Sequence, residues 1–375
     1  MICRCCGEKI ATKPLIAYKN MPKSAQFFPD KKTLHKDVGV NLTLTQCPFC
    51  GMVQLEGEPV PYFRDVIRAV GISPEMALFR RKQFSDWIEH FELSGKKILE
   101  VGCGCGEYMD IMCQLNVNVE GIEHSETAVD KALAKGHTVF RTFIDNVDTK
   151  IKGAPYGAFY VLNFLEHIPT PVQFLHGIVN NLSAEAFGLV EVPNFDIVLH
   201  KKMYSEFIQD HLLYFTAETL SRLLEWCGFE VLSCKPVWHE YILSAEVRKR
   251  NGIDISGFHS QEKLLKNSVV SWLDKMQKEG LRVAVWGASH RTLANLSLWN
   301  VSNRLDCVVD SADFKQNKYT PATHLPVVAP AELNARSVGA VLIMADGYSE
   351  EIRQIMKEQY AHICCAVLSD NGIEE

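Results

Sequence analysis

Between residues 61 and 250, short runs of apolar residues alternate with longer stretches in which apolar residues recur on one helical face. The apolar runs predict buried β-strands, and the amphipathic stretches between them predict helices. This alternation is typical of a mainly parallel, doubly wound α/β sheet with helices on both faces. The expected strands are 97–102, 117–123, 137–144, 158–164, 188–192, 229–237 and 241–247, and the expected helices include 125–135, 172–181 and 217–227.

A short break separates the last two expected strands, which predicts an antiparallel hairpin at one edge of the sheet. The polar, basic stretch 248–252 then predicts a solvated linker. Beyond it, a helix at 261–279 and strands at 282–286 and 305–309 predict a second α/β unit, whose first turn lacks a G-x-G pattern. The three expected domains are 1–60, 61–250 and 251–375, the last a Rossmann-like accessory or substrate domain.

The first domain is recognised by its cysteines. Of the 13 cysteines in the chain, many lie in apolar strands or helices as small core residues. Four others form two C-x-x-C-G pairs, which is the ligand set of a closed, tetrahedral, structural zinc site. Two disulfides are the alternative, and we disfavour them because we expect no export signal. The expected zinc ligands are Cys3, Cys6, Cys47 and Cys50, with Cys5 outside the site.

The strand at 97–102 runs into a glycine-rich turn. Gly102, Gly104 and Gly106 stand at alternate positions, and such a turn lets a ligand approach the backbone closely. The spacing lacks the third glycine of the dinucleotide fingerprint G-x-G-x-x-G. Glu100, just before the turn, would face the pyrophosphate of a dinucleotide but suits a cationic ligand. Because Glu123 closes the next strand, where an acid can bind a ribose diol, the pattern favours S-adenosylmethionine (SAM).

Polar residues follow further strands on the side of the sheet where the ligand is expected. His167 comes after a carboxylate, and His211 comes after Asp210, ahead of the helix at 217–227. Two histidines on loops at this side are candidates for proton transfer. The further cofactor contacts that we expect are Asn163, Leu165 and, on the adenine, Asp145.

All three segments resemble the nucleotide-sugar C-methyltransferases, which act on 4-keto deoxysugars. The cysteine pairs resemble the zinc module of that family, and the glycine turn together with 163–169 resembles its SAM domain. The most specific match is 310–333, with K-Y-T-P-x-T-H-x-P-V inside it, since generic methyltransferases lack this segment. The resemblance implies a class I SAM methyltransferase domain with a seven-stranded sheet, flanked by a zinc-binding module and a Rossmann-like C-terminal domain.

The resemblance also implies a general base. The family has a Glu-His pair before a Tyr-Phe dipeptide, with the histidine as the base, and here Asp210 and His211 stand before Tyr214-Phe215. A second family histidine corresponds to His167. The chain departs from the family member that we compare at Ile208, where that protein has a tyrosine, and at 68–76, where it has a tyrosine-rich segment. Both differences bear on the sugar and on the atom that is methylated.

The chemistry of SAM suggests what each residue would do. Its methyl group, attached to a sulfonium, needs an acceptor with a lone pair in line behind it. An oxygen or nitrogen has such a pair, whereas a carbon must first lose a proton beside a carbonyl to give an enolate. In this hypothesis His211 takes the proton, Asp210 orients His211 and raises its basicity, and His167 stabilises the enolate or relays the proton.

Three other functions fit parts of the sequence. An O- or N-methyltransferase on a sugar or another small metabolite would use the same cofactor site. The intact glycine turn and its two acids argue against a zinc-module adaptor with a vestigial SAM fold. The net charge of −6 and the lack of a basic stripe argue against an RNA methyltransferase. The expected partner is therefore a small molecule such as a nucleotide sugar, and not a nucleic acid.

Composition adds little to these expectations. A hydrophobic content of 47% and a charged content of 22% are ordinary for a globular protein. No apolar stretch approaches the length of a membrane span, and the N-terminus lacks a basic region followed by an apolar one. We therefore expect a cytoplasmic protein without membrane contact, acting as a monomer or a small homo-oligomer.

Overall fold

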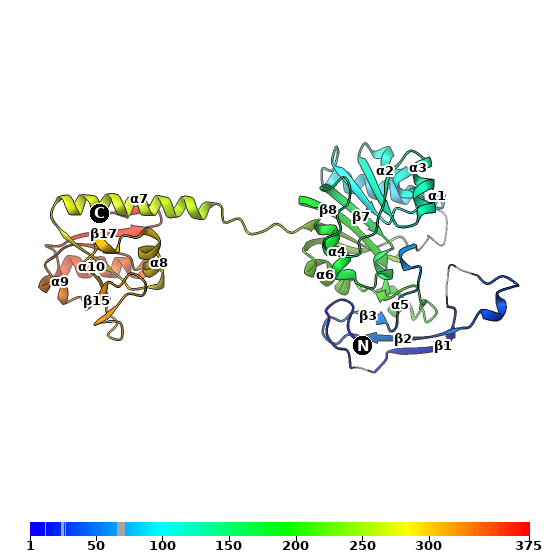
Figure 1. Cartoon of the computed structure of the whole chain (residues 1–375), viewed down its shortest axis with the longest axis horizontal. Helices are drawn as coiled ribbons and strands as arrows, with labels where there is room; N and C mark the ends of the chain where they lie inside the picture. Colours follow the sequence, from blue (N-terminus) through cyan, green and yellow to red (C-terminus); the bar gives the residue numbers. More distant parts are fainter. Residues whose placement is uncertain (12, 24–25, 27, 66–71) are drawn as a thin grey trace. The chain divides into compact units, whose positions relative to one another are not determined.

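The computed structural model describes residues 1–375 except 12, 24–25, 27 and 66–71, and it contains two compact units, Met1–Gly252 and Ile253–Glu375 (Figure 1). The first unit holds both the cysteine-rich segment and the sheet expected at 61–250. Cysteines of the two C-x-x-C pairs belong to the same hydrophobic core as strands of that sheet. The three-domain division therefore stays a prediction.

The first unit is built on a seven-stranded sheet with the order β10-β11-β8-β7-β4-β5-β6. The strands are β4 (Lys97–Val101), β5 (Asn118–Glu123), β6 (Thr138–Arg141), β7 (Tyr156–Leu162), β8 (Leu182–Pro193), β10 (Phe229–Val237) and β11 (Ile242–Lys249). Five strands are parallel, whereas β11 runs antiparallel to both of its neighbours. When the seven strands are numbered 1 to 7 along the chain and read from β6 to β10, the order is 3-2-1-4-5-7-6. This is the class I methyltransferase arrangement, so the expected fold and its terminal hairpin are confirmed.

Helices cover both faces of this sheet (Figure 1). Apolar residues of α4 and α6 pack in the core on one face, and those of α1, α2 and α3 pack in the core on the other. The helices of this unit are α1 (Pro74–His90), α2 (Glu107–Met112), α3 (Glu126–Ala134), α4 (Pro171–Val179), α5 (Phe195–Lys201) and α6 (Ala217–Trp226). The three helices expected from the sequence correspond to α3, α4 and α6.

Two strand ends differ from the expectation. β6 ends at Arg141, because the residues after it leave the sheet and line a pocket. β8 begins at Leu182, well before the expected apolar run at 188–192, because Ser183, Ala184 and Glu185, which are not buried, hide the strand pattern in its first half.

The cysteine-rich segment forms a second, antiparallel sheet from β1 (Ile16–Met21), β2 (Val40–Gln46) and β3 (Val53–Leu55). Its fourth strand, β9 (Leu213–Tyr214), comes from the far part of the unit and pairs with β3. A two-residue strand leaves no periodicity in the sequence, so this pairing was not expected. The apolar loop at 20–28 falls partly outside the described residues, and its Phe28 is 87% exposed.

The second unit has a seven-stranded sheet with the order β14-β15-β13-β12-β16-β17-β18, parallel in its five central strands. Its strands are β12 (Arg282–Trp286), β13 (Cys307–Val309), β14 (Lys318–Tyr319), β15 (Pro326–Val328), β16 (Val338–Ile343), β17 (Cys364–Ser369) and β18 (Gly372–Glu374). Its helices are α7 (Gly257–Lys278), α8 (His290–Trp299), α9 (Glu332–Ala335) and α10 (Ser349–Gln359). This is the expected Rossmann-like architecture.

Short 3-10 helices complete the chain: η1 (Leu34–Lys36), η2 (Phe63–Asp65), η3 (Cys113–Leu115), η4 (Leu165–His167), η5 (Ser302–Arg304) and η6 (Asp346–Tyr348). In the part of the chain that the structure describes, no helix combines the length and the apolar character needed to cross a bilayer. The cytoplasmic location stays a prediction.

A buried ion pair fastens α1 to the end of β8. Arg80 Nη1 donates a hydrogen bond to Glu191 Oε2 at 2.5 Å, and both side chains are fully buried. Gln83 donates to the other carboxylate oxygen of Glu191, and the backbone carbonyl of Glu191 accepts the N–H of Asn163. The pair therefore fixes a helix to the strand ends that carry the expected site.

Replacing Arg80 by leucine would leave the carboxylate of Glu191 buried without its cation. We expect the free energy of unfolding to fall by about 3–5 kcal/mol. Lys82→Leu, in an exposed pair with Asp86 on the same helix, is the matched control and should cost less than about 1 kcal/mol. Denaturant titration followed by circular dichroism measures both changes. Equal, small losses in the two variants would show that the Glu191 carboxylate does not depend on Arg80.

Candidate active site

A pocket lies at the carboxyl ends of β4, β5 and β6, where ligands bind to parallel sheets of this kind. Its walls include Gly102, Glu123, His124, Phe143 and Phe164. Two of these residues, Gly102 and Glu123, were expected from the sequence to contact SAM. The pocket therefore lies where the sequence predicts the cofactor.

The glycine turn has the backbone conformation that its sequence requires. Gly102, Gly104 and Gly106 have φ angles of +74°, +55° and +79°, in the left-handed region that glycine adopts without strain. A Cβ atom on Gly106 would stand 2.6 Å from Cδ2 of His137. The N–H of Gly102 donates to the carbonyl of Ile122, which holds the turn against β5.

Glu123 joins the glycine turn to the start of α3. Its Oε2 accepts the N–H of Gly104 at 2.9 Å, and its Oε1 accepts the N–H of Ser125 at 2.8 Å. These bonds orient the carboxylate, which is 8% exposed and forms part of the pocket wall. The carboxylate is thus held at the pocket wall, where the sequence predicts the ribose of SAM.

The other expected cofactor residues lie in different surroundings. Glu100 is buried under the turn, where its Oε2 accepts the hydroxyl of Tyr160 at 2.8 Å. Asp145 follows a pocket residue but pairs with Arg64 at 2.6 Å. Asn163 has a left-handed φ of +51°, at the bend after β7. The side chain of Leu165 is fully buried in the core, so it packs rather than facing a ligand.

Sequence reasoning missed part of the pocket wall. Arg64, on η2, places its guanidinium 5.1 Å from the ring centroid of Phe143 and 4.8 Å from that of Phe63. His124 also contributes to the wall. Arg64 stands more than 30 residues before the glycine turn, and no motif marks it.

His167 is oriented by a backbone carbonyl. Its Nδ1 donates to the carbonyl oxygen of Asp210 at 2.8 Å, so Nδ1 carries the proton and Nε2 of the neutral ring keeps a lone pair. The ring of His211 stands edge-on to it, with 4.8 Å between the ring centroids. His167 is 5% exposed, whereas His211 is half-buried. The structure thus brings the two expected histidines together.

Burial keeps both histidines neutral. It lowers the pKa of His167 below its usual value, against a smaller opposing effect of Asp210. Burial, together with the neighbouring His167, lowers the pKa of His211 to about 3. At neutral pH each ring therefore offers a lone pair that can accept a proton.

Asp210 contacts both Tyr62 and His167. Its carboxylate is 2% exposed, and Oδ1 accepts the hydroxyl of Tyr62 at 2.9 Å. Its backbone carbonyl holds His167. The backbone carbonyl of Asp210 thus orients His167, and the expected orientation of His211 by Asp210 stays a prediction. The carboxylate reaches Tyr62, in the segment after the cysteine-rich sheet, and sequence alone does not reveal this contact.

Backbone hydrogen bonds hold the residues after His211 from two sides. The carbonyl of Leu212 accepts the N–H of Leu55 at 2.9 Å, and the N–H of Leu212 donates to the carbonyl of Glu166 at 2.8 Å. Phe164, in the wall of the pocket, has its ring centroid 6.5 Å from that of His167. The histidine pair is therefore one aromatic ring away from the expected cofactor.

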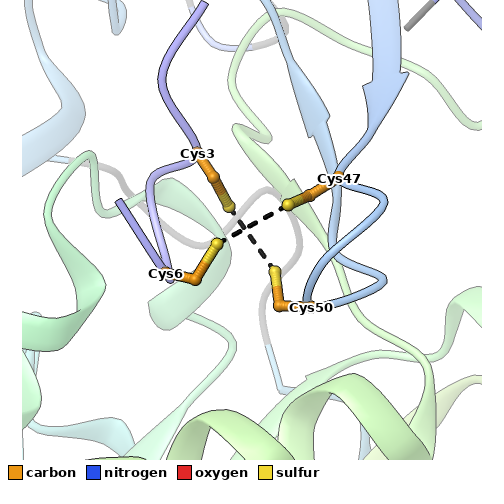
Figure 2. Close-up of side chains that lie close together, drawn as sticks. All are labelled: Cys3, Cys6, Cys47 and Cys50. Carbon is orange, nitrogen blue, oxygen red and sulfur yellow. Dashed lines mark hydrogen bonds between the residues drawn. The ribbon is translucent and has the colours of Figure 1, made fainter. Parts of the chain in front are cut away.

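Figure 2 shows the sulfur atoms of the four expected zinc ligands pointing toward one another. Sγ of Cys3 is 3.5 Å from Sγ of Cys50, and Sγ of Cys6 is 3.6 Å from Sγ of Cys47. All four lie within 4.8 Å of one another, and Cys5 is outside the group. Tetrahedral thiolates at a Zn–S distance of about 2.3 Å are about 3.8 Å apart, so the residues fit a structural zinc ion.

Each C-x-x-C-G segment forms a tight turn, here called a knuckle, that depends on its glycine. Gly7 and Gly51 have φ angles of +77° and +80°, and each donates its N–H to the carbonyl of the first cysteine of its pair. Arg222, on α6, donates from Nη1 to the carbonyl of Cys50 at 2.8 Å. The second knuckle is therefore held by α6, a helix that packs on the seven-stranded sheet of the first unit.

Comparison with known proteins agrees with this geometry. Residues 76–234 match the family model described as a methyltransferase domain, and residues 248–365 match that of a C-methyltransferase C-terminal domain. The chain is 20% identical to the C-methyltransferase NovU of Streptomyces niveus, over 95% of this chain and 92% of NovU. The protein is a SAM-dependent methyltransferase. Its C-terminal part matches a domain of C-methyltransferases, as the resemblance in the sequence predicts.

Two further similar proteins match only part of the chain. A ubiquinone biosynthesis O-methyltransferase of Azoarcus sp. (strain BH72) is 27% identical, over 43% of this chain and 78% of the relative. A solved SAM-dependent methyltransferase from Clostridium acetobutylicum ATCC 824 is 12% identical, with a TM-score of 0.39 over 46% of this chain and 92% of the other.

Glu123→Ala removes the carboxylate that we expect to bind the ribose hydroxyls of SAM. We expect SAM affinity to fall by about 2–3 kcal/mol, roughly 30- to 150-fold in Kd, the range for hydrogen bonds to a charged group. Isothermal titration calorimetry measures the change. Glu126→Ala, in an exposed pair with Arg141, is the control and should keep the wild-type Kd. An unchanged Kd in Glu123→Ala would refute the ribose assignment.

Cys47→Ser should lower the zinc content below about one ion per chain, because a hydroxyl is a poor zinc ligand. Turnover should fall as well, since this knuckle precedes β3 and β3 holds the segment after His211. Elemental mass spectrometry and a methyl-transfer assay measure the two effects. Cys5→Ser is the matched control and should keep both zinc and turnover. Wild-type protein that is free of zinc after purification without chelator would rule the site out.

Proposed function

We propose that this C-methyltransferase transfers the methyl group of SAM to a carbon of a nucleotide-linked 4-keto deoxysugar, through an enolate of the sugar. The observation that carries the proposal is the pair of neutral histidines, His167 and His211, one ring away from the pocket. The C-terminal domain match and the similarity to NovU support a carbon acceptor. The net charge of −6 favours a small molecule over a nucleic acid.

The cofactor would be held by groups that the glycine turn brings together. The backbone of the turn would approach SAM closely, and Glu123 would accept its ribose hydroxyls. Asp145, steadied by Arg64, would accept the adenine amine. When bound, SAM supplies a methyl group on a sulfonium and leaves as S-adenosylhomocysteine. Zinc would act only in the structure, because four thiolates leave no open coordination position.

His211 would act as the general base. Its lone pair takes the proton from the carbon beside the keto group, and the electrons of that C–H bond form the enolate. His167, edge-on to His211, is placed to receive this proton or to stabilise the enolate oxygen. The enolate carbon then attacks the methyl group, and the electrons of the C–S bond remain on sulfur. Holding the two reactants in line supplies the rest of the acceleration.

An O-methyltransferase is the second candidate function. The similarity to the ubiquinone biosynthesis O-methyltransferase of Azoarcus covers a share of the chain about as large as the methyltransferase domain match. In that case His211 would take a proton from a hydroxyl group, and no C–H bond of the substrate would break. Exchange of that hydrogen therefore separates the two functions.

His211→Asn keeps the size of the side chain and removes the base. With a panel of nucleotide-linked 4-keto sugars, we expect turnover to fall by about 10²–10⁴-fold while the Kd of SAM stays unchanged. In deuterated water, the wild-type protein with S-adenosylhomocysteine in place of SAM should exchange the hydrogen beside the keto group, and His211→Asn should not. Nuclear magnetic resonance of the sugar measures the exchange.

His200→Asn, at an exposed position of α5, is the matched control and should behave like the wild type in both assays. Methyl transfer without any hydrogen exchange would favour the oxygen acceptor. Wild-type turnover in His211→Asn would mean that another group is the base.

A further inference from the structure

Glu166 lies next to the histidine pair and has no part in the mechanism described so far. It belongs to η4, and its side chain is 2% exposed. Its Oε1 is 3.7 Å from Nε2 of His167. Its Oε2 is buried and, among the described residues, has no hydrogen-bond partner. One oxygen of Glu166 and one nitrogen from each of the two histidines lie within 4.8 Å of one another.

The surroundings disfavour a charge on this carboxyl group. An ionised carboxylate that is buried without a partner is costly, and burial raises the pKa of Glu166 to about 8. Asp210 and Glu191 lie on the neighbouring segments, but their carboxylates bond to Tyr62 and Arg80. The titratable groups that the described contacts bring to Glu166 are His167 and His211. Tyr214, beside His211, stays neutral because burial raises the pKa of its hydroxyl.

The tautomer of His167 decides what Glu166 can do. Since Nδ1 donates to the carbonyl of Asp210, the lone pair is on Nε2, the atom that faces Glu166. Glu166 and His167 can therefore hold one proton between them. With one shared proton, the pair is either a carboxylic acid beside a neutral imidazole or a carboxylate beside an imidazolium. Both states have no net charge, which a buried site favours.

We propose that Glu166 is the final acceptor of the proton that His211 removes from the substrate, with His167 passing it inward. The inference rests on the proposed function. The C–H bond breaks, its electron pair enters the enolate, and the proton binds the free nitrogen of His211. It then moves to Nε2 of His167, where Oε1 of Glu166 shares it. After methyl transfer the proton returns through His211, the half-buried member of the series, to solvent.

This acceptor solves a problem of the histidine pair. An imidazole whose pKa is lowered to about 3 holds a proton weakly, so the proton returns easily to the enolate before the methyl group is transferred. A carboxyl group whose pKa is raised to about 8 holds the same proton far more firmly. Glu166 touches no reacting atom and acts through His167, so it is a positioning residue rather than a catalytic one.

The pH dependence of turnover tests the proposal. Only the ionised form of Glu166 can accept a proton, so wild-type turnover on a keto sugar should rise as pH rises through about 8 and then level off. Glu166→Gln keeps the size but cannot ionise. We expect its turnover above that pH to fall by about 10²-fold and its profile to lose this rise. Glu166→Asp should restore a pH-dependent part of the activity. Glu225→Gln, exposed on α6, is the control and should match the wild type.

A second measurement needs no substrate, so it stays decisive if the proposed sugar is wrong. In protein labelled with ¹⁵N-histidine, the Nε2 signal of His167 should shift with one titration near pH 8, and Glu166→Gln should abolish that step. A Glu166→Gln variant with the wild-type pH profile would overturn the proposal. So would a His167 signal that is the same in both proteins. A second equivalent of metal per chain, lost in Glu166→Gln, would show that the cluster binds a metal ion instead.

Discussion

The proposed site has a cofactor half, formed by the glycine turn and Glu123, and an acceptor half, formed by the side chains around His167 and His211. The acceptor half depends on the pairing of β3 with β9. β3 follows the Cys47–Cys50 knuckle directly, and β9 begins two residues after His211. A strand of two residues is not stable alone and takes its position from its partner. The partner in turn belongs to a small segment whose own sheet has few strands, where four converging thiols can supply the missing stability once they hold a metal.

The same segment also reaches the loop after His167. Arg4, inside the first knuckle, donates from Nη1 to the carbonyl of Pro169 and from Nη2 to that of Gly57. The cysteine-rich segment thus contacts both histidine loops, one through a strand and one through an arginine. A structural zinc site placed this way would set the geometry of the reaction without contacting any reacting group.

The two halves of the site are built on different principles. The cofactor half consists of backbone: a turn of three glycines in left-handed conformation, locked by the carboxylate of Glu123. The proposed acceptor half consists of side chains, and burial keeps the imidazoles of His167 and His211 uncharged. An uncharged imidazole suits the proposed reaction, because its lone pair can accept the proton whose removal creates the enolate.

The sequence by itself determined the sheet, the glycine turn, the cysteine pairs and the two histidines, because each is a local pattern whose spacing carries its meaning. Only the tertiary structure decided how Asp210 is used, since its carboxylate and its carbonyl point to residues 148 and 43 positions away along the chain. The same holds for Arg64 in the pocket wall and for Glu166 beside His167. Their surroundings come from packing between distant segments, and burial, which sets the charge of a carboxyl group or an imidazole, leaves no periodic signal in a loop.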